Sequence, residues 1–139
     1  MRLVPIVDQL KASGLQRVQG VLELVSLKTP PARLPAHFVV PDSETAQPNS
    51  FTGGPIMQRT DARFGVVIML APGANQEKTS DDLQIHEDQV IEAVLGWIHP
   101  DAADGKPCEY VGARMLTVMP GALCWMVSFR TGRMIRKVM

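Results

Sequence analysis

The sequence lacks most of what marks a secreted or a membrane protein. It holds only two cysteines, Cys108 and Cys124, among 139 residues. That is too few for a disulfide-stapled secreted scaffold, so we expect both thiols to be free and reduced. The longest apolar run, residues 65–71, is far shorter than the roughly twenty residues that a membrane-crossing helix needs. No signal-peptide pattern stands at the amino terminus, and the sequence therefore predicts a soluble protein with no membrane partner.

Charge of one sign is also lacking, because fourteen Lys and Arg residues balance fourteen Asp and Glu residues. A protein that clamps nucleic acid usually carries a basic excess, so this balance disfavours nucleic-acid binding as the main function. One local bias remains at the carboxyl end, with Arg130, Arg133, Arg136 and Lys137. We interpret residues 131–139 as a basic, solvated tail, with a surface for acidic partners or passing DNA as the alternative.

Motifs for metal binding are absent, although the stretch GWIHPDAADGKPCEY (residues 96–110) is rich in possible ligands. His99, Asp101, Asp104 and Cys108 fall within ten residues of one another. Their spacing contains neither paired histidines four residues apart nor a CxxC pair. A helix end at His99-Pro100, followed by an Asp-Gly turn at residues 104–105, explains these residues without a metal. We predict a structural loop and no metal site.

Catalytic motifs are equally scarce. His86 stands beside two carboxylates, but acid-base catalysis needs a second group aimed at a substrate. Neither cysteine lies in a nucleophile motif, and no glycine-rich phosphate-binding loop occurs, so no cofactor is predicted. The alternative function that the residues leave open is a small hydrolase or metal-dependent enzyme using His86, His99 and Asp101.

What the sequence does contain is an alternation of helical and strand-like segments. Apolar residues at helical spacing predict a helix over residues 2–13. Residues 16–27 fit either period: Gly20 can separate a short strand from a short helix, and only the helix after Gly20 is favoured slightly. Prolines then form a connector to a first strand, HFVVP (residues 37–41).

Two exposed loops and one long helix follow. Residues 42–55 are rich in Pro, Gly, Ser and Thr, and a loop of this length is commonly functional. Residues 72–80 predict a second exposed loop, which ends in cap residues 79–82 before a helix that Pro100 stops. The apolar face of that helix consists of Leu83, Val90, Ile91, Val94, Leu95 and Trp97.

The remaining segments predict strands. Residues 57–71 alternate in polarity and then become apolar on both faces, which indicates a strand that is half covered on both sides. Residues 109–136 predict a hairpin that turns at residues 119–122, with Leu123, Trp125, Val127 and Phe129 on one face of its second strand. The order of elements predicts one α+β domain, residues 1–139, with an antiparallel sheet of about four strands and two or three helices mainly on one face.

Four of these segments together resemble the tail terminator proteins of long-tailed bacteriophages and prophages. They are PAHFVVPDSETA, ARFGVVIMLA, VLGWIHPDAADGKPCEYVGARML and a hairpin ending in FRTGRMIR, and they span residues 35–136. The sequence departs from the family pattern at residues 41–43, where Pro-Asp-Ser replaces the more usual Pro-Leu-Gly, and at Gly112-Ala113, where two glycines often occur.

The resemblance implies a structural protein, not an enzyme, which caps the head-proximal end of the tail tube as a ring. Implied partners are further copies of the chain, typically six, the tail tube protein, the head-completion or connector protein, and DNA passing through the ring without specific recognition. The implied location is the virion tail, after assembly in the host cytoplasm. The residues that we expect at assembly interfaces are Ser43, Glu44, Phe51, Arg59, Arg63, Arg130 and Arg133.

Overall fold

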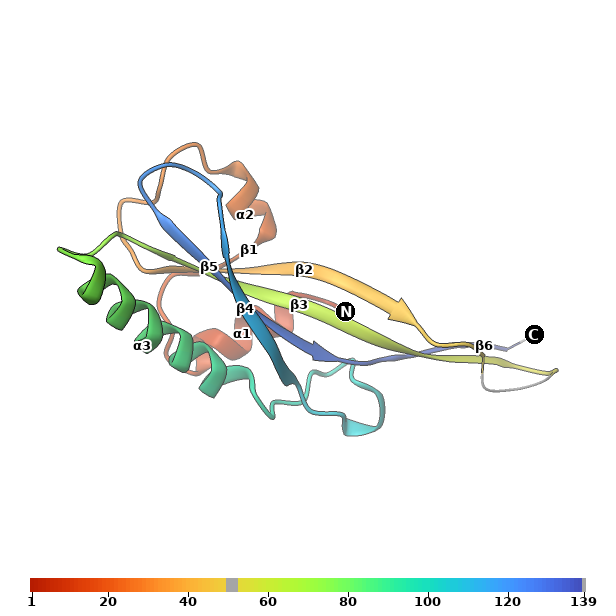
Figure 1. Cartoon of the computed structure of the whole chain (residues 1–139). Helices are drawn as coiled ribbons and strands as arrows, with labels where there is room; N and C mark the ends of the chain where they lie inside the picture. The colour runs from red at the N-terminus through yellow and green to blue at the C-terminus, as the bar shows by residue number, and fades with distance from the viewer. Residues whose placement is uncertain (50–52, 139) are drawn as a thin grey trace.

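A computed structural model describes residues 1–49 and 53–138, and it shows helices packed on a long, twisted sheet (Figure 1). The elements in chain order are α1 (Val4–Ala12), β1 (Val18–Gly20), α2 (Val21–Ser26), β2 (Ala36–Ala46), β3 (Ile56–Leu70), α3 (Gln76–Val94), the 3-10 helix η1 (Ala103–Gly105), β4 (Glu109–Leu116), β5 (Leu123–Thr131) and β6 (Met134–Lys137). The predicted α+β class is confirmed, but among the described residues the sheet has six strands and not four.

The sheet is mostly antiparallel, in the order β1-β2-β3-β5-β4, and β6 pairs with β3 beyond the end of β5. Only the β1–β2 pair is parallel. The predicted hairpin is confirmed as β4 and β5, which pair antiparallel. The central strand β3 pairs with β2 on one side and with β5 and β6 on the other, so it binds the sheet together.

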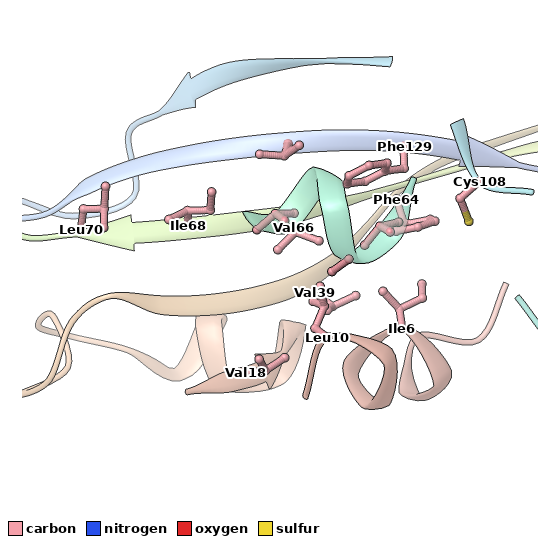
Figure 2. Packing of buried hydrophobic residues seen from close by; sticks show 14 residues of the cluster. Ile6, Leu10, Val18, Val39, Phe64, Val66, Ile68, Leu70, Cys108 and Phe129 are labelled. Atoms are coloured by element: carbon pink, nitrogen blue, oxygen red, sulfur yellow. The ribbon is translucent and has the colours of Figure 1, made fainter. Parts of the chain in front are cut away.

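The two faces of the sheet have different coverings. Side chains of α1 and α3, including Ile6, Leu10 and Val90, pack with Phe64 and Phe129 on one face (Figure 2). The hydrophobic cluster on the opposite face has fewer residues and is covered in part by side chains of α2. The face predicted for the second hairpin strand is confirmed, because Leu123, Trp125, Val127 and Phe129 all belong to the first cluster.

Three predicted boundaries are wrong. β2 continues to Ala46, so residues 42–46 are strand and not loop, although they are exposed. α3 begins at Gln76, because the Asn75 side chain caps it by accepting from the Lys78 amide at 2.8 Å. The helix also ends earlier than Pro100, since Leu95 leaves the helical conformation and Gly96 has a φ of 80°.

The predicted solvated tail is the fourth correction, because Met134–Lys137 forms strand β6 against the first residues of β3. Gly132 permits this arrangement. A Cβ at Gly132 would collide with the Thr60 carbonyl oxygen, so the chain can pass β3 this closely only with glycine here.

Candidate assembly surfaces

The outer parts of three strands extend beyond the helices as a narrow ribbon (Figure 1). We call this ribbon the arm and define it as residues 42–46 of β2, residues 56–61 of β3, and β6. Its register places Thr45 opposite Asp61 on one side and Arg59 opposite Met134 on the other. Most of its side chains are exposed, so backbone pairing and polar contacts hold it instead of an apolar core.

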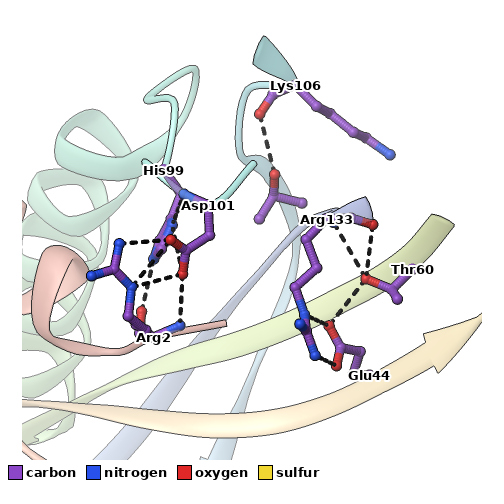
Figure 3. A network of polar contacts seen from close by, with 8 residues as sticks. Arg2, Glu44, Thr60, His99, Asp101, Lys106 and Arg133 are labelled. Atoms are coloured by element: carbon purple, nitrogen blue, oxygen red, sulfur yellow. Dashed lines mark hydrogen bonds and ion pairs between the residues drawn. The ribbon is translucent and has the colours of Figure 1, made fainter. Parts of the chain in front are cut away.

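A clamp of three residues fixes the base of the arm (Figure 3). The Arg133 guanidinium donates to both carboxylate oxygens of Glu44, at 2.7 and 2.8 Å. Thr60 Oγ1 donates to the same carboxylate at 3.0 Å, and the Thr60 amide donates to the Arg133 carbonyl at 3.0 Å. The hydrogen bonds from Arg133 lower the pKa of Glu44 to about 2. The clamp therefore joins β2, β3 and the start of β6.

The other arginines expected at an interface also have partners within the chain. Arg59 pairs with Asp104 of η1, and Arg63 lies 3.7 Å from Asp61. Arg130 pairs with Glu109 across the β5–β4 ladder at 3.0 Å. Ser43 is exposed on β2, and Phe51 falls outside the described residues.

His99 and Asp101 belong to a second polar cluster, at the amino terminus (Figure 3). The Arg2 guanidinium donates to Asp101 at 2.6 Å, and this contact lowers the pKa of Asp101 to about 2. His99 is buried, its Nε2 donates to the Arg2 carbonyl at 2.7 Å, and its Nδ1 accepts from the Asp101 amide at 2.9 Å. These two bonds make Nε2 the donor and Nδ1 the acceptor of the ring.

The loop that holds this cluster is closed by its own backbone. The Gly96 amide donates to the Cys108 carbonyl and the Cys108 amide donates to the Trp97 carbonyl, both at 2.8 Å. Asp104 has a φ of 52°, as expected of an Asp-Gly turn. Burial raises the pKa of the Cys108 thiol to about 11, which makes it a poor nucleophile. The interpretation of residues 96–110 as a structural loop agrees with these bonds.

His86 does not join His99 and Asp101; it lies against His37 on β2, with ring centroids 6.5 Å apart. The two imidazoles line a hollow of about 250 Å³. His37 Nδ1 donates to the Gln16 carbonyl at 2.7 Å, and burial lowers the pKa of His37. His37 Nε2 and His86 Nδ1 are buried without a hydrogen-bond partner in the described part of the chain.

Sequence reasoning missed His37, because nothing in HFVVP marks its histidine as different from the buried residues around it. Within residues 1–49 and 53–138, no group of three His, Cys, Asp or Glu side chains could hold a metal ion. His86 therefore lies in the contact between α3 and β2, whereas His99 and Asp101 lie in the polar cluster at the amino terminus. The structure does not bring the three side chains together.

Arg2 and Asp101 of one polar cluster and Arg133 of the other line a hollow of about 510 Å³. The fold, with its projecting arm, defines a protein of the α+β class. The chain matches the family model described as phage tail terminator protein over residues 1–138, and it belongs to this family. The family points to a structural and not an enzymatic role, in phage tail assembly. The comparison with curated proteins found no match. In the described residues, no helix has both the length and the apolar character needed to cross a membrane.

Proposed function

We propose that the chain caps the head-proximal end of the tail tube as a ring, ends tube polymerisation and forms the surface for head joining. The observation that carries this proposal is the family match, which covers residues 1–138 and is not limited to one motif. The partners are further copies of the chain in a ring of six, the tail tube protein and the head-completion protein. DNA passes through the ring without specific recognition.

The arm supports this proposal because it offers free strand edges. β1 pairs with β2 only as far as Val39, so the described part of β2 beyond that point has no partner strand on its outer side. Outside the arm, β4 is the edge strand on the opposite side of the sheet. Unpaired N–H and C=O groups on such edges readily pair with another chain. We assign the β2 edge, which includes Ser43, to an assembly contact.

A terminator must present different surfaces to its neighbours, to the tube and to the head. Head-to-tail contacts between copies close into a ring when their rotation permits, and such a ring has two unlike faces. In this proposal one face ends the tube, and the other receives the head connector. The ring assembles in the host cytoplasm and remains at the head-proximal end of the virion tail.

The test is polymerisation of the phage's own tail tube protein with and without this chain. We expect tubes to stop lengthening when the protein is added, with a ring visible at one end by electron microscopy. Tube protein alone is the control for spontaneous termination. Continued elongation in the presence of excess folded protein, with no density at either end, would contradict the capping function.

A further inference from the structure

The neutral chain separates its charges between two distant places. α3 carries six acidic residues and one lysine, a net charge of −5 from six minus one. Residues 130–139 carry four basic residues and no acidic one. In Figure 1, α3 lies on the body of the molecule, and β6 lies far from it, at the end of the arm. The two charge surpluses therefore lie too far apart to neutralise each other within one copy.

A groove on the acidic side has a fixed position between α1 and α3. It measures about 670 Å³ and is lined by residues 13–15 after α1 and by Asp88, Gln89, Glu92 and Ala93 of α3. We call it the acidic groove. Asp88 and Glu92 are both exposed, and neither has an ion pair within the described residues. The Asp88 carboxylate accepts a hydrogen bond from Gln84 Nε2, at 2.9 Å.

The position of these carboxylates is unfavourable for the isolated chain. Asp88 and Glu92 are four residues apart on one helix, so like charges face each other. Glu92 also stands in the last turn of α3, where the helix dipole favours cations. α1 ends at Ala12, next to the same groove, with Lys11 in its last turn. A cation supplied from outside would relieve both conflicts on α3.

The arm presents two cations, whose side chains extend from opposite faces of strand β6. Arg136 and Lys137 are adjacent and exposed on β6. Among the described residues these two have no ion pair, whereas Arg130 and Arg133 are held by Glu109 and Glu44. Two apolar side chains flank the pair, Ile135 at 38% exposure and Val138 at 88%.

We propose that the acidic groove of one copy receives Arg136 and Lys137 of the next copy. This inference rests on the proposed ring and names the contact that closes it. Because the groove and the arm are different surfaces, the contact is head-to-tail: each copy donates one arm and receives one. Such a contact repeats around a closed ring.

Charge reversal tests the contact. One variant carries D88K and E92K, and the other carries R136E and K137E. We expect each variant alone to need at least a tenfold higher protein concentration than the wild type to self-associate, as measured by sedimentation velocity at low salt. A chain carrying all four changes should associate again at the wild-type concentration. Melting curves verify that each variant is folded. Added salt should weaken the wild-type association, because exposed charges are screened.

Cysteine crosslinking gives a second readout that does not depend on reversing charge. Copies with Glu92→Cys are mixed with copies with Lys137→Cys under oxidising conditions. The two native thiols are buried, so they should not take part in crosslinking. We expect a disulfide-linked dimer of unlike copies. The matched control replaces Glu92→Cys with Lys28→Cys, another exposed position, and should give no dimer.

Three results would overturn the proposal: no self-association of the wild-type chain at low salt, association that survives both reversals, or no recovery in the fourfold variant. A wild-type ring that caps tubes and is indifferent to these changes would leave the proposed function standing and remove only this contact. Failure to cap tubes would remove the proposed function itself.

Discussion

Arg133 shows how a side chain expected at an interface can be used by its own chain. Arginine in a basic carboxyl-terminal run suggests a solvated or partner-binding residue, and sequence alone gives no sign of a carboxylate 89 residues away. The fold brings Glu44 to it because β2 and β6 both flank β3. The same applies to Arg59, Arg63 and Arg130, which pair with Asp104, Asp61 and Glu109.

The Glu44 clamp makes stability depend on pH. Its folded pKa is about 2, against 4.5 for an unperturbed glutamate. The contribution of the ionised Glu44 carboxylate to the free energy of unfolding is therefore complete above about pH 4.5 and is lost as the pH falls toward 2. We expect Glu44→Gln to lower the free energy of unfolding at neutral pH by about 0.2 to 1 kcal/mol, because the pair is partly exposed.

The measurement is urea unfolding of both proteins between about pH 7 and pH 2, with the difference in free energy shrinking toward the acid end. Asp42→Asn, an exposed carboxylate on the same strand with no ion pair in the described structure, is the matched control and should show no such trend. A difference that grows as the pH falls would contradict the assignment.

Phe64 is one of the largest fully buried side chains of the described core. It is 1% exposed and stacks on Phe129 with ring centroids 5.7 Å apart. Phe64→Ala should lower the free energy of unfolding by about 3 to 5 kcal/mol, from lost burial and the cavity left behind. Trp125 is only partly buried, so its replacement should cost less. Met115→Ala, at 61% exposure, is the control, and equal losses for Phe64 and Met115 would refute the burial described here.

At the scale of elements, the sequence predicted those that carry their own signal. In β3 and β5 the residues either alternate between polar and apolar or are apolar in a continuous run, and the burial of these strands follows directly from that pattern. β6 was not predicted as a strand, and β1 was predicted only as a possible short strand outside the four-stranded sheet, because each has only three or four residues. Such short segments become strands only by pairing with a neighbour, and that neighbour is set by the fold. The start of α3 was misplaced because two sets of cap residues, Asn75 and residues 79–82, compete in the sequence.

Removal of β6 should separate folding from assembly. Deletion of residues 134–139 leaves the described core clusters intact, because neither contains a residue of β6. We expect the melting temperature of the truncated chain to fall by only a few degrees, on the order of a 1 kcal/mol loss, while tube capping and self-association are abolished.

The matched control deletes only residues 138–139, which keeps the pairing of β6 with β3 and keeps Arg136 and Lys137. This shorter deletion should retain assembly. Collapse of the fold on removing β6 would show that the strand supports the core, and full assembly without it would show that the arm is not a contact.

At the scale of the whole molecule, the sequence predicted the family and the class of fold, but not the arm. The arm exists because β6, far along the chain, returns to pair with the first residues of β3 beside the end of β2, and no local pattern records that pairing. The acidic groove was missed for the same reason: Asp88 and Glu92 look like an ordinary solvated helix face until α1 is placed beside them. Physical proximity, not residue type, defines both surfaces.

Charge balance over the whole molecule also predicts how the free chain meets DNA. The chain is neutral, and Arg130 and Arg133 are already paired, which leaves Arg136 and Lys137 as the unpaired cations of the carboxyl end. We expect weak binding to duplex DNA, with log K falling against log salt with a slope no steeper than roughly −2, since each phosphate contact contributes about −0.9. Replacing Arg136 and Lys137 with alanine should abolish it, and replacing Arg114, exposed on β4, is the control. Tight binding with a much steeper slope, unaffected by the loss of Arg136 and Lys137, would mean that another surface of the monomer recognises DNA and that passage through the ring is not a passive event.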